Sequence, residues 1–358
     1  MSKNKAKIIG ATVLTSTILL SGCGLLNKET QKQIDPPKTV TVKEENVSKD
    51  VSKDVSKETT VKEKAAAKDT VKMELYLIDK DGYVVPQTLA LPKTTSVAKQ
   101  ALQYLVANGP VTDMLPNDFR AVLPEDTDIS VNIKDNGLAI VNFSKEFKNY
   151  QPEDEQKILQ SVTWTLTQFD NVKSVKLQMN GHDLTEMPVN GTPISENLSR
   201  ATGINIDNSG VVDIANTKPV TIYYMGGEEG SYYYVPVTRR ISNSEKDNYA
   251  AVIDQLIKGP SAKSTLVSEF MSDVKLLEAP KYEDGTVTLN FNKNIYDSFD
   301  KKEISQSLLD ALVLSLTEQQ GVEKVAVEVN GKAGIKNDQG KSVSEPVTRP
   351  EKVNTGSY

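Results

Sequence analysis

The stretch YVVPQT at residues 83–88 returns as YYVPVT at residues 233–238, an offset of 150 positions. The dipeptide Gly109-Pro110 recurs at the same offset as Gly259-Pro260. Self-similarity at a fixed offset is the sequence signature of a repeated structural unit. A repeated unit therefore predicts further matches at the same spacing.

Two longer matches continue the series. GLAIVNFSK, which begins at Gly137, matches GTVTLNFNK, which begins at Gly285. NVKSVKLQMNG at residues 171–181 matches GVEKVAVEVNG at residues 321–331. Four matches in one order and at a nearly constant offset indicate a tandem duplication of one domain.

Each copy predicts the same elements: strand, strand, helix, strand, strand, helix and strand. Turn residues such as Asp81-Gly82 separate short extended runs, as expected of hairpins. Apolar residues at helical spacing predict two helices in each copy, and alternating apolar residues predict the later strands. The predicted helices lie within residues 97–106, 158–169, 249–257 and 304–316. The fold class is α+β, with two helices packed on one face of a small mixed or antiparallel sheet.

Helix ends can also be predicted from the sequence. Gly109 and Gly259 each precede a proline, which predicts left-handed caps at the ends of the first helices. Ser96 is placed to cap the start of one of these helices with its hydroxyl group. Asp300 and Glu303 have the spacing of a capping box for the last helix.

The N-terminus has the features of a lipoprotein signal. Three lysines precede the apolar run IIGATVLTSTILL, which is too short to span a membrane stably. It leads into Leu20, Ser21, Gly22 and Cys23, which resemble a bacterial lipobox. That resemblance implies cleavage before Cys23 and acylation of its thiol, with palmitate among the expected lipids. The alternative is an ordinary signal peptide that leaves an unpaired cysteine.

The predicted organisation follows from these segments. Residues 28–72 are rich in charged and hydroxyl side chains, and such a segment is too polar to form a core. As a flexible chain it reaches roughly 35–40 Å; the alternative is a partner-binding peptide. We expect a signal peptide (1–22), a lipidated tether (23–72), the first domain (73–200), a linker (201–218), the second domain (219–348) and a tail (349–358).

The composition excludes several functions. A formal net charge of -6 argues against a nucleic-acid-binding protein. One cysteine and one histidine exclude an intrachain disulfide and most soft metal sites. The chain has no run of eighteen or more apolar residues, so we expect no membrane-spanning helix in the mature protein.

Candidate catalytic motifs are incomplete. SVAK at residues 96–99 lacks the companion motifs of penicillin-recognising enzymes. DKDG at residues 79–82 lacks the later ligands of a calcium loop and is better explained as a turn. His182 has no partner ligand, and Asp154 and Glu155 suit the first turn of a helix. We therefore predict no catalytic residue, no metal site, no cofactor and no enzyme activity.

Tyrosines on the first hairpin of the second copy are the candidate binding residues. Consecutive side chains in a strand point to opposite faces, so some of these tyrosines are expected at the surface. Tyr224, Tyr232 and Tyr234 are the candidates for contact with a protein partner or with peptidoglycan. The alternative is cross-strand packing within the hairpin.

The lipobox, the polar tether and the duplicated GP, NF and VNG motifs resemble the GerM family of sporulation and germination lipoproteins. The resemblance covers residues 3–348 and rests on the order of the motifs. It implies two tandem GerMN domains, similar to ring-building motifs, and a non-enzymatic role. It also implies a lipid anchor on the extracytoplasmic face of the mother-cell membrane. The implied partners belong to the channel complex between mother cell and forespore. The alternative is an envelope lipoprotein that binds a wall glycan or a small ligand.

Overall fold

The computed structural model describes residues 69–355 apart from Gly210, Val212, Glu229, residues 298–299 and Lys301. All of these residues belong to one compact unit. The predicted signal peptide, the lipobox with Cys23 and the tether up to residue 68 lie outside the described residues.

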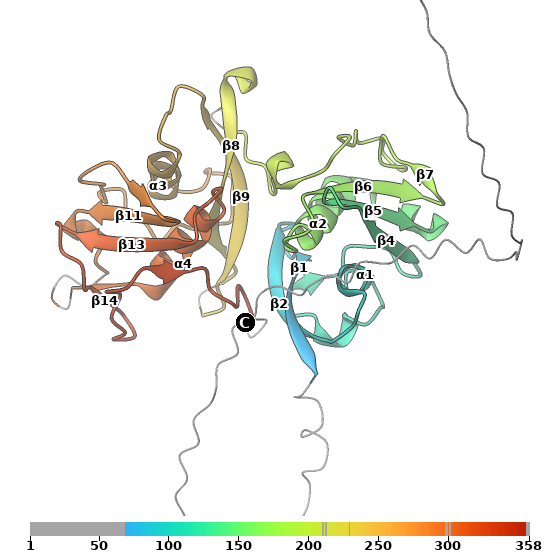
Figure 1. Ribbon diagram of the computed structural model, residues 1–358, viewed down its shortest axis with the longest axis horizontal. Helices are drawn as coiled ribbons and strands as arrows, with labels where there is room; N and C mark the ends of the chain where they lie inside the picture. The colour runs from blue at the N-terminus through green and yellow to red at the C-terminus, as the bar shows by residue number, and fades with distance from the viewer. Residues whose placement is uncertain are drawn as a thin grey trace, which may run out of the picture. The chain divides into compact units, whose positions relative to one another are not determined.

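The first repeat contains a hairpin and a separate four-stranded sheet (Figure 1). In the hairpin, β1 (Thr70–Asp79) pairs antiparallel with β2 (Val84–Pro92), and the short β3 (Phe119–Arg120) pairs with the other edge of β1. The four-stranded sheet has the order β4-β5-β6-β7. Its strands and the two α-helices of the repeat are β4 (Ile129–Ile133), β5 (Leu138–Phe143), β6 (Ser174–Met179), β7 (His182–Asp183), α1 (Val97–Gln103) and α2 (Glu155–Leu166).

The second repeat returns to the same plan. Its hairpin joins β8 (Thr217–Gly226) to β9 (Tyr233–Ser242), and a sheet of order β10-β11-β13-β15 follows. A short parallel pair, β12 (Glu303–Ile304) with β14 (Lys336–Asn337), is added. The remaining elements are α3 (Asn248–Lys258), β10 (Lys281–Glu283), β11 (Thr286–Phe291), α4 (Gln306–Thr317), β13 (Lys324–Val329) and β15 (Val347–Thr348).

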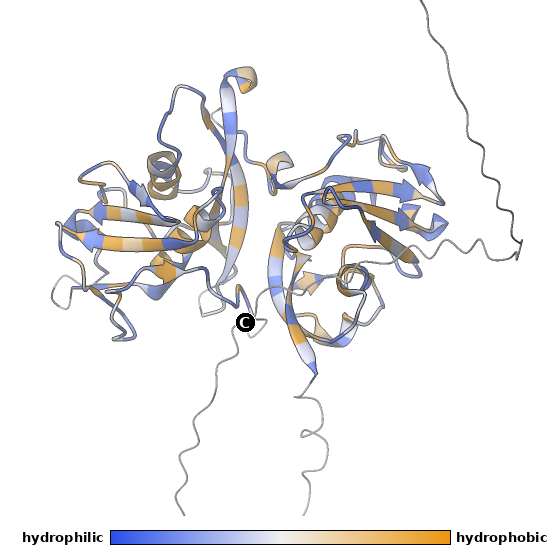
Figure 2. Ribbon diagram, in the orientation of Figure 1, coloured by the Kyte–Doolittle hydropathy of each residue, from blue (hydrophilic) through white to orange (hydrophobic). Residues whose placement is uncertain are grey.

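One helical crossover defines each four-stranded sheet. The chain leaves β5, passes through α2 and returns in β6, which pairs parallel with β5; β11, α4 and β13 repeat this connection. Ala139, Val141 and Phe143 alternate with less buried residues, so one face of the sheet forms core. The same alternation is visible along β11 and β13 in Figure 2.

The α+β class is confirmed, but the predicted single sheet is divided into two. Consecutive residues of the first hairpin are buried, from Leu75 through Asp79 on β1 and from Val84 through Leu89 on β2. A strand buried at successive positions is covered on both of its faces. The hairpin is therefore an inner layer and not an extension of the sheet that has one exposed face.

Two predicted domain boundaries shift. β1 begins at Thr70, so residues 70–72 belong to the strand and not to the tether. At the other end, Val353 and Asn354 are buried, although they lie in the segment that was predicted to be a C-terminal tail. Their contacts, described below, explain why this segment is ordered.

The predicted glycine caps are half right. Gly259 closes α3 with a φ of 73°, and its N–H donates to the carbonyl oxygens of Gln255 and Leu256 at 3.2 and 3.3 Å. α1 already ends at Gln103, and Asn108, not Gly109, takes the left-handed conformation. Helix α1 stops early because the following residues pair with another segment, where Ala107 N donates to Leu123 O at 2.8 Å.

The other two predicted caps are wrong. Ser96 precedes α1 but its side chain makes no capping hydrogen bond. The capping box at Asp300 and Glu303 does not form, because Glu303 lies in β12. Helix α4 is capped instead by Ser305, whose hydroxyl accepts a hydrogen bond from Leu308 N.

Candidate functional site: the junction between the repeats

The segment that ends each repeat docks on the hairpin of the other repeat. These are residues 200–205 and residues 349–354, which we call the first and second terminal segments. They match as RATGIN and RPEKVN, at an offset of 149. Both segments bring an arginine and an asparagine into the region between the repeats.

Asn205 joins the two hairpins. Its Oδ1 accepts a hydrogen bond from Val84 N at 2.8 Å, and its Nδ2 donates to Val84 O at 2.7 Å. The same Nδ2 donates to Pro236 O at 2.8 Å. One amide therefore binds the backbone of β2 in the first repeat and of β9 in the second.

Asn354 makes the reciprocal set of bonds. Its Oδ1 accepts from Tyr234 N at 2.8 Å, and its Nδ2 donates to Tyr234 O at 2.9 Å and to Pro86 O at 2.8 Å. Tyr234 and Pro86 are the repeat equivalents of Val84 and Pro236. When residue i contacts j and the equivalent of j contacts the equivalent of i, the interface is isologous, as in a two-fold dimer.

The residue before each asparagine makes further reciprocal hydrogen bonds between the repeats. Ile204 N donates to Thr238 Oγ1 at 2.9 Å, and Thr238 N donates to Ile204 O at 2.8 Å. In the equivalent place Val353 N donates to Thr88 Oγ1 at 3.1 Å, and that hydroxyl donates to Val353 O at 2.9 Å. Each terminal segment thus binds the hairpin of the other repeat through its backbone.

The two arginines converge on one buried carboxylate, Glu318. Arg200 Nη1 donates to both carboxylate oxygens at 3.0 and 2.8 Å, and Arg349 Nη1 lies 3.1 Å from Oε1. Tyr223 OH donates to the same oxygen at 2.9 Å. Burial by itself raises the pKa of Glu318, but the two guanidinium groups outweigh it and hold the pKa below its ordinary value.

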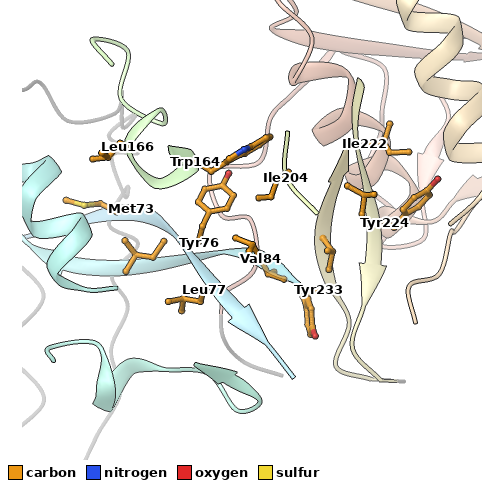
Figure 3. Close-up of a cluster of buried hydrophobic side chains, with 14 of the residues drawn as sticks. Met73, Tyr76, Leu77, Val84, Trp164, Leu166, Ile204, Ile222, Tyr224 and Tyr233 are labelled. Atoms are coloured by element: carbon orange, nitrogen blue, oxygen red, sulfur yellow. The ribbon is translucent and has the colours of Figure 1, made fainter. Parts of the chain in front are cut away.

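Aromatic rings complete the charged cluster. The Arg200 guanidinium lies over the Trp164 ring at 4.4 Å, and Arg349 lies 5.5 Å from the Tyr223 ring. Tyr76 lies beside Trp164 (Figure 3), and the two ring centroids are 5.6 Å apart. Burial raises the pKa of both tyrosine hydroxyls, so they stay neutral donors at physiological pH.

The cluster is not symmetric in charge. The equivalent of Glu318 in the first repeat is Gln168, which exchanges hydrogen bonds with the backbone of Glu74 at 3.0 and 2.8 Å. The two arginines therefore share one glutamate at the centre, and Arg349 gains Glu74 at 4.0 Å. The positive charges of the two arginines are therefore balanced by the negative charges of Glu318 and Glu74.

A second buried carboxylate closes the junction near the hairpin turns. Asp79 accepts hydrogen bonds from Tyr83 N at 2.8 Å and from Tyr233 OH, in the other repeat, at 2.9 Å. Burial raises the pKa of Asp79. The Tyr233 ring packs edge-on against Phe119, with centroids 5.1 Å apart.

Comparison with known proteins assigns these repeats to a family. A family model described as Germane, sporulation and spore germination, matches residues 74–185 and 221–334. The two matches cover more than half of the chain and fall one in each repeat. The chain belongs to the Germane family.

Relatives of known name support the assignment over the whole length. The chain is 54% identical over 366 aligned positions, covering 100% of both chains, to the spore germination protein GerM of Bacillus subtilis (strain 168). It is also similar to the solved tandem GerMN domains of the B. subtilis sporulation protein GerM, at 59% identity with a TM-score of 0.76. That match covers 80% of this chain and 100% of the solved one.

In this Germane protein the three candidate tyrosines are not equally accessible. Tyr224 is only 1% exposed, and its hydroxyl donates to Gln255 O at 2.8 Å. Tyr234 is half-buried and its hydroxyl donates to Asp310 at 3.2 Å. Tyr232 is 43% exposed. The expectation of three surface tyrosines is therefore corrected to one, because the hairpin is covered on both faces.

The paired carboxylates at the start of α2 are both engaged. Asp154 is bound by Arg120 at 2.8 Å and by Lys157 at 2.9 Å. Glu155 is buried and accepts hydrogen bonds from Tyr150 OH at 2.9 Å and from the backbone N–H groups of Val189, Asn190 and Thr192. Hydrogen bonding of this kind anchors a loop to the helix.

The other residues considered from the sequence lie apart from the junction. His182 is exposed on β7, and the SVAK stretch at residues 96–99 opens α1. Within the described part of the chain, no group of three or more acidic, histidine or cysteine side chains is placed to hold a metal ion. No helix in that part has both the length and the apolar character needed to cross a membrane.

Sequence reasoning missed the junction, although a signal was present. The repeat comparison stopped at the VNG strand and did not reach RATGIN and RPEKVN. Continuing the comparison to the end of the chain, at an offset of 149, pairs Arg200 with Arg349 and Asn205 with Asn354. Polar residues that recur in two otherwise divergent segments would have marked a shared contact.

Proposed function

We propose that this Germane protein supports sporulation and spore germination as a non-enzymatic, lipid-anchored scaffold on the extracytoplasmic face of a membrane. Its partners would be proteins of the channel complex between mother cell and forespore. Membership of a sporulation and spore germination family and similarity to the B. subtilis spore germination protein GerM support the sporulation role. The lipobox at residues 20–23 supports the anchor.

The observation that carries the scaffold role is the reciprocal junction. Strongly perturbed titratable groups usually cluster at catalytic sites. In this protein, however, the titratable groups that shift one another's pKa lie across the junction and contact one another. Each of them is bound by another member of the cluster or lies against an aromatic ring; the members are Glu318, Arg200, Arg349, Tyr76 and Tyr223. These groups hold the two repeats together. A scaffold protein needs its domains fixed in this way.

Deleting the gene tests the role, with spore yield, germination and vegetative growth scored separately. We expect fewer mature or germinating spores and unchanged vegetative growth. Complementation with the wild-type gene should restore both, whereas Cys23→Ser should release the protein from the membrane fraction and fail to complement. Normal sporulation and germination in the deletion strain would disprove the proposal.

Co-purification separates the scaffold from a wall-binding protein. We expect the wild-type chain to retain other sporulation proteins after mild cross-linking, and not to bind purified peptidoglycan saturably. The wall-binding alternative now rests chiefly on Tyr232, since Tyr224 is buried and Tyr234 is half-buried. Saturable glycan binding that Tyr232→Ala abolishes, without any protein partner, would favour that alternative.

A further inference from the structure

A cavity of about 340 Å³ lies where the two repeats meet. Small-molecule sites commonly have volumes of about 300–1,000 Å³ and occur at domain interfaces. The first repeat contributes the turn before β2 and one side of α2, and the second contributes β8, β9 and the loop after α3. Residues of the first terminal segment and the linker line it between these elements.

The polar groups that line this cavity are mostly hydrogen-bond donors. Lys157 uses one N–H on Asp154 at 2.9 Å, and Lys263 is exposed at the rim with no ion pair among the described residues. The side-chain oxygen of Gln160 accepts a hydrogen bond from Asn205 N at 3.0 Å, so its amide N–H groups remain available to donate to a ligand. An ammonium group carries three donors, so both lysines keep donors for a ligand.

A hydroxyl pair adds one further donor. Tyr83 OH and Ser264 Oγ lie 2.9 Å apart, and Ser264 Oγ also accepts from Leu266 N at 3.1 Å. One of the two hydroxyl protons makes the bond between them, and the other is left to donate outward. Ser261, another lining residue, carries a further hydroxyl.

The acidic residue in the lining is already neutralised. Asp207 accepts from Ser209 N at 2.9 Å, and its other oxygen lies 3.4 Å from Arg239 Nε. Arg239 is itself buried and bound to Gly259 O at 2.9 Å. The net character of the lining is therefore positive and donor-rich.

The duplication provides an internal comparison for this charge. At an offset of 150, Lys157 corresponds to Ser307, Gln160 to Asp310 and Lys263 to Asp113. Two lysines and an amide on one side of the junction are thus replaced by a serine and two aspartates on the other. The donor-rich character belongs to one side of the junction and is not a by-product of the repeat.

We propose that this cavity binds a small ligand through an anionic group, a carboxylate or a phosphate. Lys157 and Lys263 would supply positive charge, and Gln160 with the Tyr83–Ser264 pair would supply neutral donors. Because both repeats line the cavity, a bound anion stabilises their pairing. This site does not depend on the scaffold role, and it stands whether or not larger assemblies form.

The test uses the full chain in detergent and two matched pairs of probes. N-acetylmuramic acid is compared with N-acetylglucosamine, which lacks the lactyl carboxylate, and glycerol 3-phosphate is compared with glycerol. We expect one charged probe to bind with a Kd of about 1 mM or tighter by calorimetry and to raise the melting temperature. Its neutral counterpart should do neither, and the pair that responds identifies the source of the anion.

Two variants keep the fold and change the site. Lys263→Gln removes an exposed charge and should weaken binding about tenfold, the loss expected for one charge-assisted hydrogen bond. Gln160→Glu keeps the acceptor for Asn205 N but replaces the free amide by a carboxylate, and it should abolish binding. Lys99→Gln, an exposed lysine on α1 away from the cavity, is the control and should leave the Kd unchanged.

Three outcomes would overturn the proposal. The first is that neither charged probe binds in this range. The second is that the neutral probes bind as well as the charged ones. The third is that Lys263→Gln and Gln160→Glu bind like the wild-type chain, which would place the anion elsewhere.

Discussion

Asn205 and Asn354 bind equivalent backbone atoms on opposite repeats, each with three hydrogen bonds of 2.7–2.9 Å. An asparagine side chain offers one acceptor and two donors, and in both cases all of them are used. This double clamp is reciprocal, so the first predictions concern its disruption.

Asn354→Ala should destabilise the protein by about 1–3 kcal/mol, because Tyr234 N, Tyr234 O and Pro86 O lose a partner in a buried place. A lower melting temperature measured by calorimetry checks this. Asn330→Ala is the matched control, since Asn330 is exposed and also has a positive φ, 50° against 57° for Asn354. Equal losses in both variants would assign the effect to backbone conformation and not to the clamp.

Glu318→Gln should destabilise by about 3–5 kcal/mol, because it leaves two buried guanidinium groups without their shared carboxylate. Chemical denaturation at neutral pH measures the loss. Glu323→Gln changes an exposed glutamate and is expected within about 0.5 kcal/mol of the wild type. A Glu318→Gln variant as stable as that control would contradict a structural role for the cluster.

Trp164, the single tryptophan of the chain, makes the junction visible by fluorescence. Arg200→Lys removes the planar guanidinium group that lies over its ring at 4.4 Å, and an ammonium group cannot stack in the same way. We expect a shifted emission spectrum and a loss of about 1 kcal/mol or more. Arg240→Lys, whose guanidinium binds Thr217 instead, should leave the emission unchanged.

Glu155 predicts a defined acid response. Burial raises its pKa, but hydrogen bonds from Thr192, Asn190 and Tyr150 outweigh burial and lower it from 4.5 to about 2. A carboxyl with a lowered folded pKa stabilises the fold above its unfolded pKa, and this stability is lost as pH falls through the folded value. Glu155→Gln should therefore be less stable at pH 7.

The pH dependence distinguishes this effect from a general loss of packing. The stability difference between Glu155→Gln and the wild type should shrink as pH falls from 4.5 to about 2. Thermal melts across this range measure it. Glu153→Gln, which changes an exposed neighbour on the same turn, should show no such convergence. A constant difference at every pH would contradict the prediction.

The fold was largely predictable because its elements are local. Alternation through Ala139, Val141 and Phe143 indicated a half-buried strand, and helical spacing indicated α2 and α4. The caps failed where tertiary pairing decided the chain's path, as at Asn108 and at β12. Local sequence patterns carry no information about those partners.

The junction was harder to predict because its partners are far apart in the sequence. Tyr224 was expected at the surface from strand alternation, but both faces of its hairpin are covered. Glu318 is replaced by the neutral Gln168 in the first repeat, so its position opposite two arginines follows only from the arrangement of the repeats. Periodicity identifies the apolar face of a strand or helix, and it does not show whether another segment covers the opposite face.

The isologous junction has one further consequence. A two-fold contact uses the same surface of both partners and leaves no free copy of that surface at either end. Because both halves are in one polypeptide, dilution cannot separate them, and their stoichiometry is fixed during translation. Growth into a larger array, at any concentration, must therefore use surfaces other than the hairpins.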